Sequence, residues 1–399
     1  EFSLVIVTWS DNFTINNSNI SSNGLRVYWN DNLTIINSNI NTTSNDAIRL
    51  YESDNINILN NYIESNCTNC ESLMLEGENN ATISNNNIIA RDGDSYNIGF
   101  DEACTDNIIS NNTISHPESG KSSLYLYGTN DNIIDSNTIN SASSPISLAL
   151  SSSGNLVQNN SLTCGEDCII ILGDSENNIL VNNNMSLLGT GYKAIDDSTG
   201  GSFYNTVVYN NSYSQILWNK TDLDTSINLS VEETIFLENN LAGLIDDSDA
   251  EYLNTSAQLE FKGLSYSVDP FLLKNGVRCD NSSICNTSYS GSNLYANVSS
   301  FSNYSTRASS PYVTLIQPTD NYNNDSSESI NINFTCNVTD ETRLDNLTLF
   351  IWNRTGGVNY TNTTTINGTE NSSSWNRSII RGNYTWNCLA YDNHSQASW

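Results

Sequence analysis

The sequence predicts an all-β chain made of a parallel β-helix followed by two β-sandwich domains. Three observations lead to this fold class. A repeat of about 25 residues recurs through residues 9–225, each period holds short segments of alternating apolar and polar residues, and no segment keeps a helical period. The remaining residues, 226–308 and 309–399, lack the repeat and show strand-like segments between polar turns.

The repeat has the form Asn/Asp-x-x-apolar-x-Asn-x-x-apolar, and its copies begin at residues 12, 32, 55, 80, 106, 131, 154, 177 and, in degraded form, 204. A single coil cannot bury its own apolar side chains, so we expect about nine coils to stack and equivalent residues to form columns. The first apolar column comprises Ile15, Ile35, Ile58, Ile83, Ile109, Ile134, Val157, Leu180 and Val207, and the second Ile20, Ile40, Ile63, Ile88, Ile114, Ile139, Leu162 and Met185.

A second type of strand lies between the copies, with pairs such as Leu25/Val27, Ile48/Leu50 and Leu124/Leu126. Several strands in each period favour a β-helix over a leucine-rich repeat, whose Leu-x-x-Leu-x-Leu consensus is absent. One polar column is expected to form a ladder of stacked side-chain amides: Asn17, Asn37, Asn60, Asn85, Asn111, Asn159 and Asn182.

Residues 1 to about 225 resemble the right-handed β-helix repeats of NosD-like and related surface or carbohydrate-acting proteins. The resemblance implies a right-handed parallel β-helix. It does not imply one function, because that fold occurs in lyases, hydrolases, adhesins and inert stalks.

The second half of the chain is expected to hold two further β domains. Strands are predicted at 233–238, 257–261, 271–277 and 294–298, and then at 313–316, 330–338, 347–352, 375–380 and 384–390. Cys336 and Cys388, with Trp352 between them, resemble an immunoglobulin-like sandwich, and this resemblance implies a disulfide across the two sheets with a tryptophan packed on it. Residues 382–392 resemble Ig-like repeats of archaeal S-layer-type and filament proteins.

The cysteines indicate an oxidising exterior. Cys67/Cys70 and Cys164/Cys168 lie four coils apart, about 19 Å, so the two pairs cannot share a zinc ion. Local disulfides are favoured there, as in the short loop closed by Cys279 and Cys285. Cys104 is left over and is expected to be a buried thiol.

Composition excludes some functions and weighs against others. With 14 Lys+Arg against 44 Asp+Glu, the net charge of −30 excludes nucleic-acid binding, and no apolar run is long enough to span a membrane. With only 2 His, we expect no catalytic residues and no enzyme. Adjacent acids such as Asp196 and Asp197 would point to opposite faces of a strand. No metal-ligand set and no cofactor are expected, although acidic turns could hold Ca²⁺ without catalysis.

The 68 Asn residues supply many Asn-x-Ser/Thr sequons, which predict N-linked glycans and an extracellular, cell-surface location. The candidate sites are Asn12, Asn32, Asn80, Asn219, Asn254, Asn297, Asn333, Asn346, Asn383 and Asn393.

The two ends of the chain suggest assembly. Residues 1–8 form an apolar strand without an obvious partner, with candidate donor residues Phe2, Leu4, Val5, Ile6 and Val7. The last sandwich apparently lacks its final strand, because only a polar stretch follows the strand of Cys388. Together they predict donor-strand complementation between subunits and an open head-to-tail polymer. In the alternative interpretation, residues 1–8 begin the β-helix and a processed or trimmed chain has lost its last strand.

These observations favour a glycosylated structural subunit of an extracellular surface filament or S-layer-like assembly, with copies of itself as partner. The alternatives are an adhesin that binds surface carbohydrate, for which Tyr125 and Tyr127 could line a sugar-binding face, and a β-helix polysaccharide lyase or hydrolase.

Overall fold

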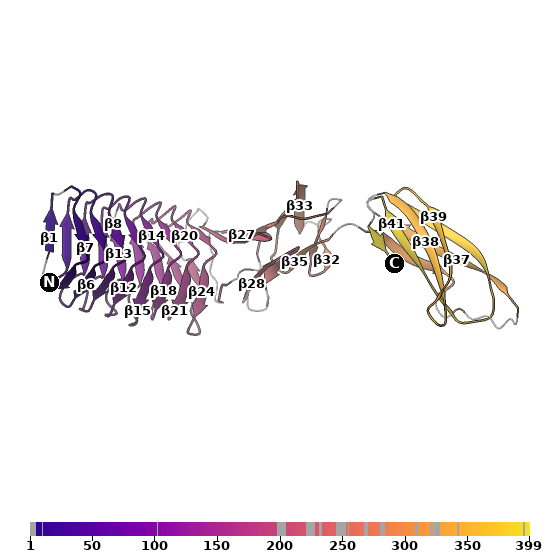
Figure 1. The fold of residues 1–399 in the computed structure, drawn as a ribbon, viewed down its shortest axis with the longest axis horizontal. Helices are drawn as coiled ribbons and strands as arrows, with labels where there is room; N and C mark the ends of the chain where they lie inside the picture. Colours follow the sequence, from indigo (N-terminus) through magenta and orange to yellow (C-terminus); the bar gives the residue numbers. More distant parts are fainter. Residues whose placement is uncertain are drawn as a thin grey trace.

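The structure is a computed structural model, and it describes residues 5–9, 11–101, 103–197, 205–220, 228–230, 234–244, 253, 255–266, 270–279, 284–307, 310–319, 322, 328–340, 343–393 and 396–399. The described residues form strands and no helix, so none of them could cross a membrane as a helix. The chain is elongated, with the β-helix at one end and the last two sheets at the other (Figure 1). The predicted all-β fold class is confirmed.

Three parallel sheets run along the β-helix. The nine-stranded sheet contains β1 (Val5–Thr8), β4 (Leu25–Tyr28), β7 (Ile48–Tyr51), β10 (Leu73–Glu76), β13 (Ile98–Asp101), β16 (Leu124–Tyr127), β19 (Ile146–Ala149), β22 (Ile169–Ile171) and β25 (Ile195–Asp197). The eight-stranded sheet contains β3 (Asn19–Ser22), β6 (Asn39–Thr42), β9 (Tyr62–Ser65), β12 (Asn87–Ala90), β15 (Thr113–His116), β18 (Thr138–Ser141), β21 (Ser161–Cys164) and β24 (Asn184–Leu187).

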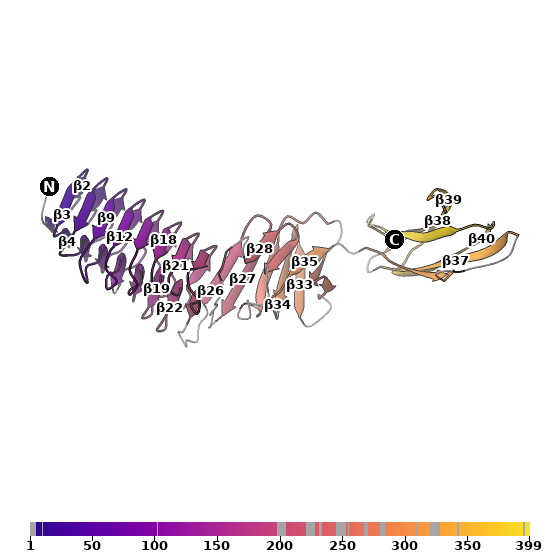
Figure 2. The same cartoon turned by 90° about the horizontal axis from the view of Figure 1, so that it is seen from below.

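The third, thirteen-stranded sheet begins with β2 (Thr14–Asn16), β5 (Thr34–Ile36), β8 (Asn57–Leu59), β11 (Thr82–Ser84), β14 (Ile108–Ser110), β17 (Ile133–Asp135), β20 (Leu156–Gln158), β23 (Ile179–Val181) and β26 (Asn205–Asn210). Equivalent residues pair in register on successive coils, as Ile83 does with Ile58 and Ile109. Figure 2 shows the coils stacked along one axis. Both predicted apolar columns lie in the core of this helix.

The first residue of the repeat has a left-handed backbone on every complete coil. Its φ is 58° at Asn12, 61° at Asn32, 56° at Asp131 and 71° at Gly154. Asn, Asp and Gly tolerate this region better than other residues, which explains why the repeat begins with them.

The predicted amide ladder is displaced by one residue. Asn17 and the other members of the predicted column also have positive φ values and lie in turns. The buried ladder uses the residue that follows the left-handed position from the second coil onward: Ser38, Asn61, Asn86, Asn112, Asn137, Asn160 and Asn183. Within it, the Oδ1 of Asn137 accepts hydrogen bonds from the backbone N and the Nδ2 of Asn112, at 2.9 and 3.0 Å. The predicted column was therefore wrong, because the left-handed turn directs the second Asn of each pair inward.

A second ladder, which the sequence analysis did not find, runs through Asn107, Asn132, Asn155, Asn178 and Asn205. It starts at coil five, since Leu33, Ile56 and Ala81 fill the same position in earlier coils. The two ladders satisfy buried backbone groups at the turns on either side of the thirteen-stranded sheet.

The thirteen-stranded sheet continues beyond the β-helix, across the boundary expected at residues 225/226. β26 pairs antiparallel with β27 (Ser214–Lys220), which leads to β30 (Ala257–Phe261), β34 (Asn293–Val298) and β33 (Cys285–Ser290). A five-stranded sheet covers it: β28 (Ile235–Glu238), β29 (Leu241–Leu244), β35 (Tyr304–Arg307), β31 (Phe271–Lys274) and β32 (Val277–Arg278). One hydrophobic core extends from Val7 to Tyr304, so the middle region is joined to the β-helix and not separate from it.

The C-terminal sandwich has its own core. One sheet contains β36 (Tyr312–Gln317), β37 (Ile330–Thr339) and β40 (Glu370–Ile379), and the other β39 (Val358–Thr365), β38 (Leu344–Asn353), β41 (Tyr384–Asp392) and β42 (Ala397–Ser398). The Cys336–Cys388 disulfide joins the two sheets as predicted. Trp352 does not pack on it, which corrects that expectation: Trp352 stacks on Phe350 with ring centroids 5.6 Å apart, and Trp375 is the buried tryptophan of this core.

Two expectations about the ends of the chain need correction. Val5, Ile6 and Val7 belong to β1, which pairs in parallel with β4, so the N-terminal strand is the first strand of the β-helix and not a spare one. Phe2 and Leu4 lie outside the described residues. The last sandwich has a final strand, β42, although it pairs with β41 only at Ala390 and Tyr391.

Candidate functional site

The outer face of the nine-stranded sheet carries many aromatic and charged side chains. Alternate residues of each strand point away from the core, and flanking turns add further side chains. We call this surface the aromatic–acidic face. Its members are Trp9, Arg26, Tyr28, Trp29, Asp46, Arg49, Tyr51, Glu52, Glu71, Met74, Glu76, Tyr96, Asp101, Lys121, Tyr125 and Tyr127.

A tryptophan pair forms the first aromatic platform of this face. Trp9 and Trp29 stack with ring centroids 4.8 Å apart and an interplanar angle of 19°. Trp9 is 76% exposed and Trp29 40% exposed, so flat apolar surface faces solvent. The indole Nε1 of Trp29 donates to the Oε2 of Glu52 at 2.9 Å, and Tyr28 extends the platform toward Tyr51.

A second platform lies four strands further along the sheet. Tyr96, in the turn before β13, stacks on Tyr125 of β16 at 4.6 Å with only 4° between the rings, and the Nζ of Lys121 lies 4.4 Å from the Tyr96 ring centroid. Gly99 makes this packing possible. A Cβ at that outward position would lie 2.7 Å from the Sδ of Met74 and 3.7 Å from the ring of Tyr96.

Charged groups lie between the platforms. Arg49 is 3.0 Å from Asp46 and also forms an ion pair with Glu76. Lys121 is 4.0 Å from Glu71. Burial, followed by the neighbouring carboxyl of Asp46, raises the pKa of Glu71 to about 7. The face therefore offers carboxyl oxygens as hydrogen-bond acceptors beside exposed rings.

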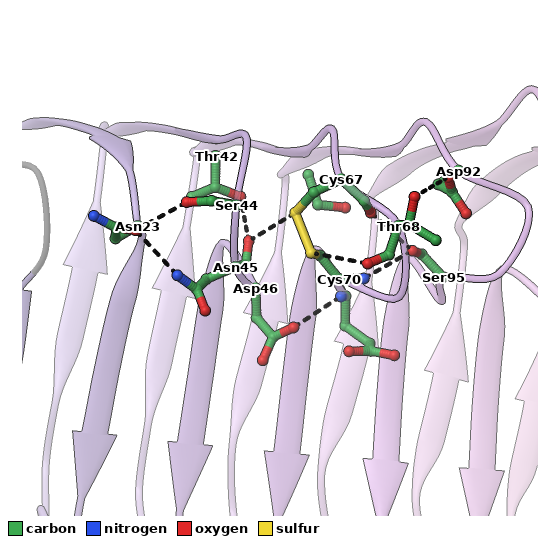
Figure 3. The surroundings of a disulfide bond; sticks show 12 residues. Asn23, Thr42, Ser44, Asn45, Asp46, Cys67, Thr68, Cys70, Asp92 and Ser95 are labelled. Atoms are coloured by element: carbon green, nitrogen blue, oxygen red, sulfur yellow. Dashed lines mark hydrogen bonds between the residues drawn. A yellow bond between two sulfur atoms is a disulfide. The ribbon is translucent and has the colours of Figure 1, made fainter.

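A disulfide rigidifies the turn that positions Glu71. Figure 3 shows Cys67 bonded to Cys70, directly before β10. The backbone N of Cys70 donates to the Oγ of Ser95 at 3.0 Å, and the backbone N of Glu71 donates to the Oδ1 of Asp46 at 3.0 Å. The turn is thus fixed to the coils on both sides.

All four predicted disulfides are present. Besides Cys67–Cys70 and Cys336–Cys388, they are Cys164–Cys168 and Cys279–Cys285. Four disulfides indicate an oxidising compartment.

The remaining acidic and thiol groups singled out by sequence do not form a site. Asp196 faces outward and pairs with Lys193 at 2.6 Å, whereas Asp197 is buried and accepts from Asn205, so the two carboxylates do face opposite ways. Cys104 is a buried free thiol whose pKa burial raises to about 12. Its neighbour Glu78 is also buried, which raises the pKa of that carboxyl to about 9. Glu102 lies outside the described residues.

The sequon asparagines avoid the aromatic–acidic face. Most of the predicted glycosylation sites are exposed; Asn346 is half-buried and Asn254 lies outside the described residues. Within the β-helix the sequons begin at Asn12, Asn16, Asn19, Asn32, Asn41, Asn66, Asn80, Asn111, Asn159, Asn184 and Asn210. The described strands of the nine-stranded sheet contain no Asn. Glycans at these positions would leave that sheet uncovered, and glycosylation itself stays a prediction.

Comparison with protein families yields two matches. Residues 3–166 match the family described as periplasmic copper-binding protein (NosD), and residues 109–263 match the right handed beta helix region. No curated protein is significantly similar to the chain. The archaeal S-layer resemblance is not confirmed by these matches.

Several solved structures are similar to the chain, at low sequence identity and low TM-score. DFA-IIIase from Arthrobacter chlorophenolicus A6 is 17% identical, with 48% of each chain covered and a TM-score of 0.37. Dettilon tailspike protein is 11% identical (77% of this chain and 87% of that one; TM-score 0.28), and PfbA, a surface adhesin of Streptococcus pneumoniae, is 15% identical (56% and 79%; TM-score 0.30). The chain thus spans about half the length of DFA-IIIase.

One sequence-based expectation is overturned by these structures. We expected no enzyme, because His and Lys are scarce. Structures of an enzyme, DFA-IIIase, are among those that this chain resembles, so the exclusion of catalysis is not supported. The argument failed because it counted residue types over the whole chain, whereas catalysis needs only a few groups at one site.

A copper site does not fit the described residues. Copper is held by Cys, Met and His side chains. His116 is buried with its Nε2 3.0 Å from the carbonyl oxygen of Asp92, Met185 is buried in the core, and no three His, Cys, Asp or Glu side chains converge in the described part of the chain. His394 lies outside the described residues. Calcium at acidic turns stays a prediction.

The in-register coils, the apolar columns and the two family matches agree with one another. They show that the described coils from β1 to β26 form a right-handed parallel β-helix, which is similar to the NosD family over residues 3–166.

Proposed function

We propose that the chain is an extracellular surface protein that binds carbohydrate through the aromatic–acidic face. The observation that carries this proposal is the exposed stack of Trp9 on Trp29. Exposed aromatic rings lose apolar hydration when the C–H face of a sugar ring covers them, and nearby carboxylates accept hydrogen bonds from sugar hydroxyls.

The tryptophan backbone supports this function. Trp9 and Trp29 have φ values of 52° and 50°, a region that costs a bulky residue free energy. At the equivalent position of later coils the chain uses Gly77, Gly128 and Gly173, which adopt positive φ without that cost, and also Glu52 and Leu150. The fold therefore has no need of tryptophan here, and unfavourable backbone geometry is typical of functional positions.

The disulfides and the predicted N-linked glycans support an extracellular location. Four disulfides suit an oxidising exterior, and a nine-stranded sheet without Asn keeps its face clear of N-linked glycans. A surface protein whose other faces carry glycans would thus keep one face for a ligand.

Affinity electrophoresis in gels containing neutral polysaccharides tests the proposal. We expect at least one polysaccharide to retard the chain, and the double variant W9A/W29A to migrate freely. Tyr213→Ala, which removes an aromatic ring that is 50% exposed outside the face, is the matched control and should be retarded like the parent. Equal retardation of W9A/W29A and the parent would place binding elsewhere.

A second candidate function is a structural subunit of a surface filament or S-layer-like assembly, polymerising head-to-tail by donor-strand complementation. The supporting observation is the edge of β41. Its outer side is paired only at Ala390 and Tyr391, so from Tyr384 to Leu389 it has no partner strand among the described residues. An unpaired strand edge accepts an added strand through main-chain hydrogen bonds.

Ile6 supplies the test of assembly. Donation to a neighbouring subunit requires β1 to leave its pairing with β4. The side chain of Ile6 points away from the β-helix core and is 59% exposed, so Ile6→Lys leaves the first coil intact while making β1 a poor strand for an apolar groove. By electron microscopy at high concentration, the parent and the Thr8→Lys control should form head-to-tail polymers and Ile6→Lys should not. Polymers of Ile6→Lys would contradict the donor-strand mechanism, and a parent that stays monomeric would contradict the assembly function.

A further inference from the structure

The charges around the two aromatic platforms define the chemistry of the ligand. We propose that the aromatic–acidic face binds an extended polysaccharide that carries no negative charge, and that it prefers amino sugars to neutral ones. This inference rests on the proposed carbohydrate-binding function and adds the charge and the minimum length of the ligand.

The bases of the face are already engaged by the protein itself. Arg49 pairs with Asp46 and Glu76, Lys121 pairs with Glu71 and covers the Tyr96 ring, and the Nη2 of Arg26 donates to the Oδ1 of Asn45 at 3.1 Å. An anionic sugar would have to displace these intramolecular partners before it could use a cation of the face.

The carboxylates outnumber the bases. The acidic members are Asp46, Glu52, Glu71, Glu76 and Asp101, against Arg26, Arg49 and Lys121. Asp101 lies on β13, at the second platform, and its side-chain carboxylate makes no hydrogen bond or ion pair within the described ranges. Its carboxylate is therefore available to a hydroxyl or an ammonium group of a ligand. The net charge of −30 on the whole chain also repels anionic ligands.

The spacing of the two aromatic platforms sets the minimum length of the oligosaccharide ligand. Trp29 directly follows β4 and Tyr125 lies on β16, which is four strands away in the nine-stranded sheet. Neighbouring strands are about 4.8 Å apart, so the platforms are separated by about 19 Å along the β-helix. A ligand that covers both must be an oligosaccharide of several units, and it gains affinity from the linkage of two sites.

Three hexasaccharides test the charge preference: a β-1,4-linked N-acetylglucosamine hexamer, its de-N-acetylated glucosamine form with the same linkage, and an α-1,4-linked galacturonate hexamer as the anionic probe. Dissociation constants are measured by calorimetry at 150 mM salt, where non-specific attraction to the acidic chain is screened. We expect the glucosamine hexamer to bind most tightly, the N-acetylated hexamer more weakly, and the galacturonate hexamer not at all.

Asp101→Asn identifies the group that sets the preference. It should reduce the ratio of glucosamine to N-acetylglucosamine affinity by about fivefold, the effect of one charge pair at contact distance in water. Glu238→Gln, which removes an exposed carboxylate far from the face, is the control and should leave the ratio unchanged.

The outcomes separate this inference from the proposed function. Tighter binding of galacturonate, or a ratio that Asp101→Asn does not alter, overturns the charge preference while carbohydrate binding stands. Absence of binding by all three hexamers overturns both.

Discussion

Trp9 and Trp29 occupy the same position on successive coils, each directly after a strand of the nine-stranded sheet, and their rings stack 4.8 Å apart. The backbone N of Trp9 donates to the carbonyl of Tyr28, and that of Trp29 to the carbonyl of Tyr51, so the parallel ladder aligns the two rings. The coil spacing of about 4.8 Å is close to the distance at which aromatic rings stack. A β-helix can thus build an aromatic platform from one residue repeated on adjacent coils.

Trp29→Gly should separate binding from stability. Glycine removes the cost of a left-handed backbone at a bulky residue, and the loss of ring stacking offsets part of that gain. We expect the free energy of unfolding to stay unchanged or rise by about 1 kcal/mol, while glycan affinity falls. Leu150→Gly is the matched control, because Leu150 has a φ of 50° in the same column of a later coil. Leu150→Gly should change stability and leave glycan affinity unchanged. A loss of glycan affinity in this variant would show that binding depends on the backbone geometry of the column and not on the tryptophan ring.

Asn137→Ala should destabilise the β-helix strongly. Its Nδ2 donates to the carbonyl of Ile109 and to the Oδ1 of Asn160, and its own Oδ1 accepts from Asn112. Unpaired buried groups cost about 1–3 kcal/mol each, so the thermal midpoint should fall by several degrees. Asn140→Ala removes an exposed amide from β18, the strand that directly follows Asn137, and should leave the midpoint nearly unchanged. Equal midpoints for the two variants would refute the ladder.

Removal of a disulfide should lower the free energy of unfolding more when the loop that the disulfide closes is longer. Cys336 and Cys388 are 52 residues apart, and Cys67 and Cys70 only 3. Loop-entropy arguments give about 4 kcal/mol for the longer loop and about 2 kcal/mol for the shorter. Chemical denaturation followed by tryptophan fluorescence should therefore show C336A/C388A losing more stability than C67A/C70A. The reverse order would contradict an entropic origin.

Glu78 should make stability depend on pH. Burial raises the pKa of Glu78 from 4.5 to about 9, so the folded chain retains a proton that the unfolded chain releases. The stabilising contribution is complete below pH 4.5, falls as pH rises, and is lost once pH passes about 9. We expect Glu78→Gln to unfold at a higher temperature than the parent at pH 8 and at a similar temperature at pH 4. Glu238→Gln controls for the change in net charge, and a constant difference between parent and Glu78→Gln across this range would contradict the assignment.

The sequence predicted the β-helix well because its period and its apolar columns are direct consequences of coil stacking. It misplaced the amide ladder because most ladder residues stand next to another Asn, as in Asn111-Asn112, and only the backbone conformation decides which one is buried. The pair Ser136-Asn137 could have shown which Asn is buried. In this coil the first position of the pair is Ser and the second is Asn, so only the column of second positions keeps its Asn.

The N-terminal strand was misjudged for a similar reason. Val5 and Val7 lie 20 residues before Leu25 and Val27, the offset of the first coil, which already indicated membership of the nine-stranded sheet. Most of the aromatic–acidic face was also missed. Tyr125 could be predicted to face outward, because apolar and aromatic residues alternate along its strand. Tyr96 and Lys121 lie in turns whose conformation brings them onto the sheet, and no periodicity of the sequence predicts that position. The shared column of Trp9 and Trp29 was detectable from the repeat offset.

A crystal structure of the chain with the bound glucosamine hexamer would show directly whether the aromatic–acidic face binds carbohydrate. We expect sugar rings lying flat on the Trp9–Trp29 platform, continuing toward Tyr125, with an amino group beside the carboxylate of Asp101. A hexamer bound on the thirteen-stranded or eight-stranded sheet, or no bound sugar at saturating concentration, would contradict it.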